Sequence, residues 1–143
     1  MHVLLPSILL ASSRGGQLLN LSGEIIDELV DMDLPDTTCS IRDIPNLRLT
    51  RCKFFKVESK GELFLNECRV EKVVAVKKAT LINQCEIGEV MTDEDGEVWI
   101  EKCKNVKAVA TGRVILDQVF PSMKLHVKIL IRTADFSVYT EGS

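Results

Sequence analysis

Leu63-Phe64-Leu65-Asn66-Glu67-Cys68 is a six-residue motif that recurs through the middle of the chain. Its other clear copies are Leu47-Arg48-Leu49-Thr50-Arg51-Cys52, Thr80-Leu81-Ile82-Asn83-Gln84-Cys85 and Val98-Trp99-Ile100-Glu101-Lys102-Cys103. The four cysteines follow one another at steps of 16, 17 and 18 residues. Weaker copies fit Gln17–Ser22, the surroundings of Cys39, and Val114–Val119. A repeat of this kind marks a structural unit that buries its apolar side only against its neighbours.

Alignment on the cysteine position produces apolar columns separated by polar ones. The column three residues before it holds Leu19, Leu49, Leu65, Ile82, Ile100 and Leu116. The columns two and five residues after it hold Ile41, Phe54, Val70 and Ile87, and then Ile44, Val57, Val73, Val90 and Ala108. The apolar residues come in short bursts with local alternation, which indicates strands. Helical repeats need about 30 residues or more, so a unit this short favours one turn of a narrow parallel β-helix.

We therefore predict an all-β fold: a single-domain, right-handed parallel β-helix (solenoid) with about seven short coils and a C-terminal β-strand or hairpin cap. The predicted division is an N-terminal cap over residues 1–16, coils over 17–123, and the C-terminal strand or hairpin over 124–143. A β-sandwich is the competing fold, because its strands are also short and regularly spaced. Column identity favours the solenoid, since hairpin strands alternate in direction and have no reason to repeat one unit in register.

Two kinds of corner are expected in each coil. Asn66 and Asn83, two residues before the cysteine, are typical of a corner with left-handed backbone. Gly61 and Gly96, just before the next unit, mark the other corner. Residues 24–33 fit either a short acidic helix or an irregular early coil.

Composition narrows the functional classes. The chain has 143 residues and a net charge of −3, so it has no general basic field and we expect no nucleic-acid partner. Five cysteines are an odd number, and we predict free, buried thiols in a reducing, cytoplasmic setting. The apolar segment 1–10 is expected to cap the first coil rather than to contact a membrane.

No motif indicates catalysis, a cofactor or a metal. The cysteines are spaced by a coil length rather than as Cys-x-x-Cys, and the only histidines are His2 and His126. Core stacking of thiols is the preferred interpretation. The acidic segment Thr92–Gly96 is interpreted as a solvated corner and not as a calcium loop. We expect the protein not to be an enzyme, with a β-helix carbohydrate-active enzyme as the third hypothesis.

Two surfaces carry the functional hypotheses. Leu125, Val127, Ile129 and Ile131 alternate with other, mostly polar residues, which predicts a strand that either caps the last coil or pairs with another subunit. The first hypothesis is thus a structural or scaffolding protein that self-associates into a dimer or a filament by edge-to-edge strand addition. The alternative is an adapter that binds an acidic protein partner through a Lys/Arg stripe made of Lys53, Lys56, Arg69, Lys72, Lys104 and Lys107. Glu86 and Glu89 fall within its columns, where stacked opposite charges are expected.

The apolar columns on a coil of about 17 residues resemble those of bactofilins, which are polymer-forming cytoskeletal β-helix proteins. The resemblance covers residues 17–119 and implies a self-assembling structural role. Stretches such as Glu101-Lys102-Cys103-Lys104-Asn105-Val106 also look like the small β-helix domains of cyclase-associated proteins and tubulin-binding cofactor C. The second resemblance implies that a C-terminal hairpin over residues 124–140 swaps between subunits. Neither resemblance supplies site residues.

Overall fold

A computed structural model of the chain describes residues 8–12, 17–21, 28–42, 44–119, 124–130 and 134–139, with side chains described outside 17–21 and 134–139. The described residues form fifteen strands and no helix. The strands are β1 (Ile8–Ser12), β2 (Gln17–Leu21), β3 (Glu28–Val30), β4 (Asp33–Ile41), β5 (Asn46–Thr50), β6 (Lys53–Ser59), β7 (Glu62–Asn66), β8 (Arg69–Ala75), β9 (Lys78–Ile82), β10 (Glu86–Met91), β11 (Glu97–Glu101), β12 (Asn105–Thr111), β13 (Arg113–Asp117), β14 (Lys124–Ile129) and β15 (Ala134–Tyr139).

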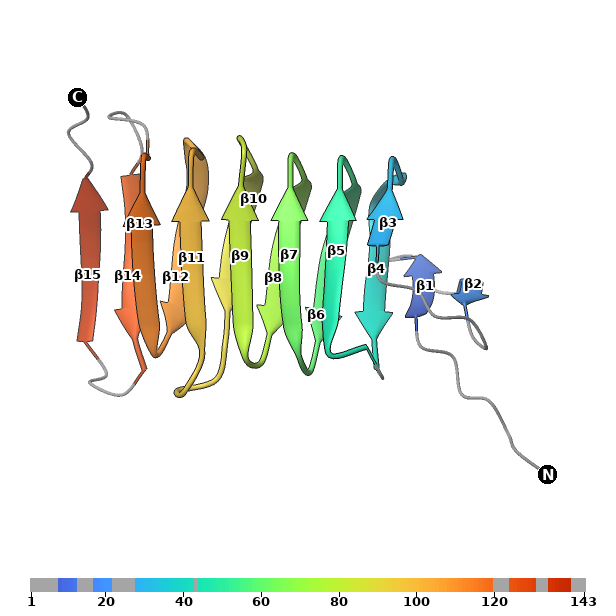
Figure 1. Cartoon of the computed structure of the whole chain (residues 1–143), viewed down its shortest axis with the longest axis horizontal. Coiled ribbons are helices and arrows are strands. Elements are labelled where there is room, and N and C mark those ends of the chain that lie inside the picture. The colour runs from blue at the N-terminus through green and yellow to red at the C-terminus, as the bar shows by residue number, and fades with distance from the viewer. Residues whose placement is uncertain are drawn as a thin grey trace.

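The strands form two facing sheets wound into a parallel β-helix, which confirms the predicted fold class (Figure 1). Sheet A has nine strands in the order β15-β14-β12-β10-β8-β6-β4-β1-β2. Sheet B has six strands in the order β13-β11-β9-β7-β5-β3. Each turn contributes one strand to each sheet, from β3 and β4 to β13 and β14, so the described residues make about six turns where we predicted about seven.

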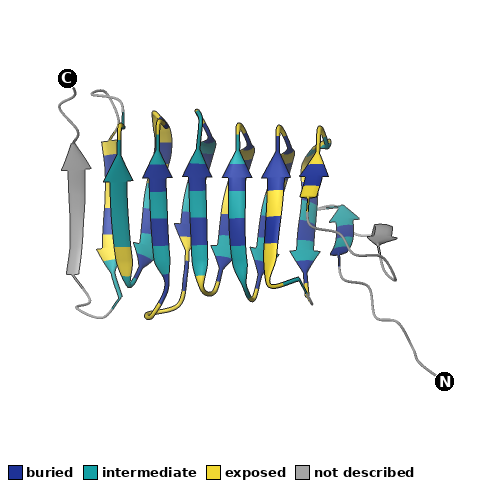
Figure 2. Ribbon diagram, in the orientation of Figure 1, coloured by how far each residue is buried: buried dark blue, intermediate teal, exposed yellow. Residues whose placement is uncertain are grey.

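Buried residues form bands that run through successive coils in register (Figure 2). In sheet B, Leu49 is the register partner of Leu65, Leu65 of Leu81, and Ile100 of both Leu81 and Leu116. In sheet A the inward positions come at a spacing of three and then two, as at Phe54, Val57 and Ser59. Two consecutive outward residues therefore mark a bend within each long strand. Like side chains stacked at the strand spacing of about 4.8 Å pack against one another in the narrow interior.

The corner between the sheets depends on a residue with left-handed backbone. This residue comes one position after the asparagine column, where we had predicted it. Positive φ angles of 50 to 64° occur at Arg51, Glu67, Gln84, Lys102 and Gln118, each directly before the cysteine position. Asn83 also has a positive φ, because this coil carries an extra residue at the corner. Left-handed backbone costs a non-glycine residue about 1–2 kcal/mol. The backbone hydrogen bonds between coils, such as Arg51 N–H to Asn66 O, offset that cost.

The opposite corner needs Gly61. A Cβ atom at this position would lie 2.5 Å from the carbonyl oxygen of Pro45 in the preceding coil. Gly61 therefore has no room for a side chain, as its place in the repeat predicted. Gly96 lies at the equivalent corner, between β10 and β11.

The first coil differs from the predicted alignment. Cys39 pairs with Val57, so it belongs to the Val57 column and not to the cysteine column. Met32 takes the cysteine position instead. Its carbonyl oxygen accepts a hydrogen bond from Lys53 N–H, and the carbonyl oxygen of Cys52 accepts the equivalent bond from Arg69 N–H one coil later. A register shift between Leu34 and Thr38 adds residues to β4 and hides the repeat there. Of the two interpretations of residues 24–33, the described part, 28–33, is the early coil.

Both ends of sheet A are antiparallel, unlike the coils. Strand β1 pairs antiparallel with β4 and with β2, so Gln17–Leu21 is not the parallel coil that we predicted. The buried side chains of Ile8 and Leu10 cover that end of the core. At the other end β14 pairs in parallel with β12 and belongs to the last coil, whereas β15 returns antiparallel to β14. The coils therefore run past the predicted boundary at residue 123.

Candidate interaction surfaces

The predicted self-association residues lie mostly inside the molecule. Leu125 is 1% exposed and Val127 is fully buried, and Ile129 packs against the same core. Ile131 lies outside the described residues. Their alternation reflects the last coil's own core, so the side chains of Leu125 and Val127 do not offer contacts to a second copy.

The C-terminal end of the solenoid is nevertheless open in both sheets over the described residues. Strand β13 is the last strand of sheet B, and β15 is the last strand of sheet A. Val114 and Leu116 on β13 and Val119 beyond it are only partly buried, although they pack against the core. Equivalent residues in inner coils, such as Leu63 and Leu65, are at most 1% exposed. Among the described residues no strand of sheet B lies beyond β13, which is the physical reason for this difference.

The outer edge of β15 presents unpaired backbone groups. Leu130 N–H donates to Thr111 O at 2.9 Å, so even-numbered residues of β14 bond with β12 and odd-numbered ones with β15. Register then pairs Val127 with Phe136 and Leu125 with Val138. The N–H groups of the intervening residues, among them Ser137, point to the outer edge. An exposed row of this kind is a template for another strand.

The Lys/Arg stripe is interrupted by carboxylates. Lys53 and Arg69 are register partners, as are Lys56 and Lys72. Glu86 and Glu89 stand next in those two rows. Ion pairs join Arg69 to Glu86 at 2.5 Å and Lys72 to Glu89 at 3.9 Å, which confirms the expected stacking of opposite charges.

The last two stripe residues leave the rows altogether. Asn105 and Ala108 take the places opposite Glu86 and Glu89, because one extra residue follows Cys103. Lys104 and Lys107 are therefore out of register with the other four stripe residues. The result is a mixed-charge face rather than a continuous positive stripe.

The outer face of sheet B is the surface that the sequence analysis missed. Its middle row, in register from coil to coil, is Glu28, Arg48, Phe64, Thr80, Trp99 and Ile115. The guanidinium of Arg48 lies 4.7 Å from the centre of the Phe64 ring, at cation–π distance. The single tryptophan of the chain is thus on the outside of a protein with only 5% aromatic residues. From Arg48 onward, each residue of this row comes directly before a residue of the leucine column. An alignment by strand register would therefore have revealed the row.

A hollow of about 570 Å³ lies on the same face. Its lining includes Phe64, Thr80, Glu62 and Lys78. The rest of the lining is mostly on β3 and β5, so the hollow is centred on β5 and β7 and Thr80 lies at its edge. A hollow on an otherwise flat sheet face provides a depression that a side chain of a partner can fill.

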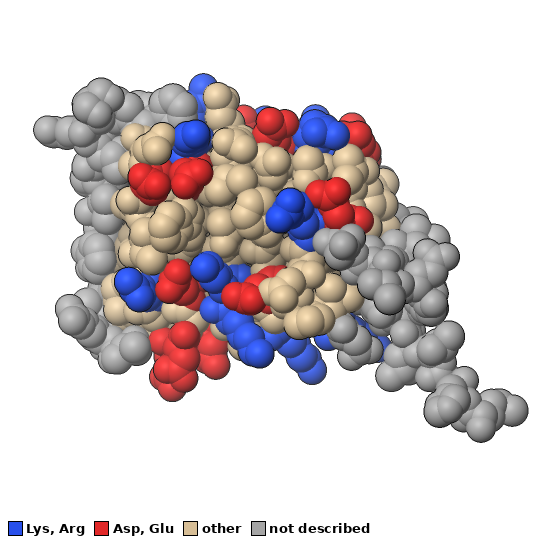
Figure 3. Space-filling model, viewed as in Figure 1, with Lys and Arg blue, Asp and Glu red and all other residues tan. Residues whose placement is uncertain are grey.

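A row of alternating charge borders the middle row. It consists of Glu62, Lys78, Glu97 and Arg113, which are register partners in successive coils. Glu97 forms ion pairs with Lys78 at 3.7 Å and with Arg113 at 3.9 Å. Figure 3 shows positive and negative side chains alternating along the lower margin of this face, with a band above them that is uncharged except for a positive and a negative group toward its right end.

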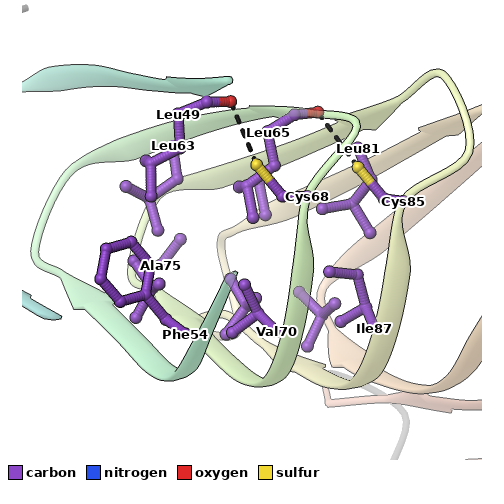
Figure 4. Close-up of a cluster of buried hydrophobic side chains, with 14 of the residues drawn as sticks. Leu49, Phe54, Leu63, Leu65, Cys68, Val70, Ala75, Leu81, Cys85 and Ile87 are labelled. Carbon is purple, nitrogen blue, oxygen red and sulfur yellow. Dashed lines mark hydrogen bonds between the residues drawn. The ribbon is translucent and has the colours of Figure 1, made fainter. Parts of the chain in front are cut away.

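Cys52, Cys68, Cys85 and Cys103 form an internal ladder of free thiols, as predicted, whereas Cys39 lies outside it in the Val57 column. All five are buried and none is in a disulfide. Ladder thiols donate to carbonyls of the preceding coil, from Cys68 to Leu49 at 3.3 Å and from Cys85 to Leu65 at 3.4 Å (Figure 4). Burial raises the pKa of Cys39 to about 12, and the hydrogen bond with Cys52 together with burial raises the pKa of Cys68. The thiols of Cys39 and Cys68 are therefore protonated and act as small core residues, whereas the hydrogen bond with Cys68 lowers the pKa of Cys52 to about 7 and the hydrogen bond with Cys85 lowers the pKa of Cys103. The described residues contain no group of His, Cys, Asp and Glu able to hold a metal ion.

The acidic segment Thr92–Gly96 is the exposed corner between β10 and β11. Gly96 N–H donates to Asp93 O at 2.8 Å and closes a turn, while Asp93, Glu94 and Asp95 face solvent. The hydroxyls of Thr92 and Thr111 hydrogen-bond at 2.5 Å beneath it. The interpretation as a solvated corner is confirmed.

Comparisons with family models, curated proteins and solved structures found no match for the chain. Within the described ranges, no helix has the length and apolar character to cross a membrane.

Proposed function

We propose that this protein is a non-catalytic scaffold whose copies join end to end through the outer edge of β15. The single observation that supports the proposal is the geometry of the open end, where sheet A extends one strand beyond sheet B. Pairing of β15 with β15 of a second copy about a twofold axis continues sheet A through both molecules. Main-chain hydrogen bonds supply the affinity in this mode of association.

The partly exposed apolar residues next to β15 favour the same contact. Val114 and Leu116 are partly buried at the end of the core, and no further coil covers them within the part of the chain that the structure describes. An end-to-end dimer brings two such ends toward each other and removes apolar surface from water, at about 25 cal/mol for each Å². The adapter hypothesis has less support, because Glu86 and Glu89 form ion pairs with Arg69 and Lys72 and interrupt the Lys/Arg stripe. Cytoplasmic location and the absence of catalysis remain predictions.

The test is a proline substitution matched with an alanine substitution at one position. Ser137→Pro removes an N–H from the outer edge of β15 and leaves the bonds to β14, whereas Ser137→Ala keeps that N–H. At low micromolar protein concentration, sedimentation velocity should show a dimer for the wild type and for Ser137→Ala, and a monomer for Ser137→Pro. Circular dichroism verifies that both variants fold. A dimer of unchanged affinity in Ser137→Pro, or a monomeric wild type at the highest concentration, contradicts the proposal.

A further inference from the structure

We propose that the outer face of sheet B is a second self-association surface, on which two copies of the chain pack face to face. The face comprises three outward rows of β7, β9, β11 and β13: the middle row from Phe64 to Ile115, the charged row from Glu62 to Arg113, and a third row of Asn66, Ile82, Glu101 and Asp117. The twofold axis runs parallel to the strands and passes between β9 and β11. This contact goes beyond the end contact at β15 and shares no residue with it.

The charged row is complementary to itself under this symmetry. A twofold axis parallel to the strands reverses the order of the coils and keeps each row opposite its own copy. Glu62 then faces Arg113 of the second copy, and Lys78 faces its Glu97. All four positions thus meet an opposite charge. An axis centred on a strand instead places a charge against its own kind.

The middle row is complementary in size under the same operation. Trp99 of each copy faces Thr80 of the other, and Thr80 lines the hollow of about 570 Å³. Each indole ring therefore lies over Thr80, at the β9 edge of the hollow of the other copy, while Phe64 faces Ile115. A tryptophan near the centre of a contact is a common form of an interaction hot spot.

The size of the face sets the strength of the contact. Four strands of five residues cover roughly 300 Å² of flat surface in each copy. A standard stable interface buries about 800 Å² for each partner. We therefore expect a weak dimer, with a dissociation constant of about 10 µM or higher.

Charge alternation also serves the fold, because stacked like charges would repel within one chain. Reversal of two charges in the same chain does not separate the role of the charged row in folding from its role in dimerisation. Two single-charge variants separate the two roles when they are mixed. Lys78→Glu places a carboxylate opposite Glu97 of a second copy, and Glu97→Lys places an ammonium group opposite Lys78 of a second copy.

The experiment uses both single variants in the Ser137→Pro background, where the end contact is absent. Each variant alone should dissociate at least about tenfold more readily than the parent, because two like-charge pairs meet at the interface. An equimolar mixture should recover the parental affinity. In the mixed dimer the new carboxylate at position 78 of one variant faces the new ammonium group at position 97 of the other, and all remaining pairs stay opposite. Sedimentation velocity with one fluorescently labelled partner reports the heterodimer.

A second readout follows the only tryptophan. Dilution of the parent should shift the emission of Trp99 to longer wavelength as the indole becomes exposed to water. Trp99→Ala should abolish the face dimer, whereas Phe55→Ala, at an exposed position on sheet A, should leave it intact.

Two results overturn the proposal. One is equal association of the parent and both single variants with no gain on mixing. The other is a Trp99 emission that does not change with concentration in a background that still dimerises. If Ser137→Pro leaves the end contact in place, end and face dimers are still distinguished by these charge variants.

Discussion

Removal of one leucine from the middle of the ladder should cost more than its size alone suggests. Leu65 is fully buried and is stacked between Leu49 and Leu81 in the adjacent coils. Leu65→Ala deletes three carbon atoms, which corresponds to about 2.4 kcal/mol of transfer free energy. The cavity adds to this loss, because the backbone ladders hold the coils at the strand spacing and prevent collapse. We expect the free energy of unfolding to fall by about 3–4 kcal/mol.

The assay is urea unfolding followed by circular dichroism, at a protein concentration low enough to exclude association. Phe55→Ala is the matched control, because it removes a larger side chain from an exposed position and should cost less than about 1 kcal/mol. An unchanged m-value shows that both variants unfold the same surface. A loss below about 1 kcal/mol for Leu65→Ala, or one equal to that of Phe55→Ala, would refute the stacked core.

Further predictions concern the corners and the thiols. Glu67→Gly should raise the free energy of unfolding by up to about 1 kcal/mol in the same urea assay, because glycine adopts the φ of 55° without strain, and a loss of stability would contradict the corner geometry. Gly61→Ala should lower it by about 1–3 kcal/mol, since the new Cβ would lie 2.5 Å from the Pro45 carbonyl oxygen, and a neutral result would show that this corner is not tight. The five thiols should resist a thiol reagent at about pH 8 until the protein unfolds, and immediate labelling of the native protein would exclude a buried ladder. The pKa of Cys39 is raised from 9.0 to about 12, so the folded state favours the neutral thiol. The free energy of unfolding should therefore fall as pH rises from 9.0 towards about 12, by up to about 1.4 kcal/mol per pH unit. Cys39→Ala should reduce that slope.

The repeat alone was sufficient to predict a β-helix. Equivalent residues stack on one another in every coil, and this stacking requires similar side chains at each column position. Leu49, Leu65 and Leu116 were placed correctly, as were the buried cysteines from Cys52 to Cys103. Insertions limited the alignment. The extra residue at Asn83 moves Leu81, and not Ile82, into the leucine column. The extra residue after Cys103 moves Val106 into the column where Asn105 had interrupted it.

The candidate surfaces were harder to predict, because they depend on register and on pairing direction. Leu125 and Val127 alternate as an edge strand would, but the same alternation arises in a strand that covers its own core. Nothing in Gln17–Leu21 distinguishes an antiparallel strand from a parallel coil. The row from Arg48 to Ile115 has no common residue type, so only the strand pairing reveals it.

The measurement that tests the central claim most directly is a set of methyl–methyl nuclear Overhauser effects among Leu49, Leu65 and Leu81. Coils stacked in register place Leu65 within about 5 Å of both other leucines, and separate Leu49 from Leu81 by about 9.6 Å. We predict strong cross-peaks from Leu65 to each neighbour and a weak or missing cross-peak between Leu49 and Leu81. Absence of both Leu65 cross-peaks in a folded protein would contradict the parallel stacking of the coils.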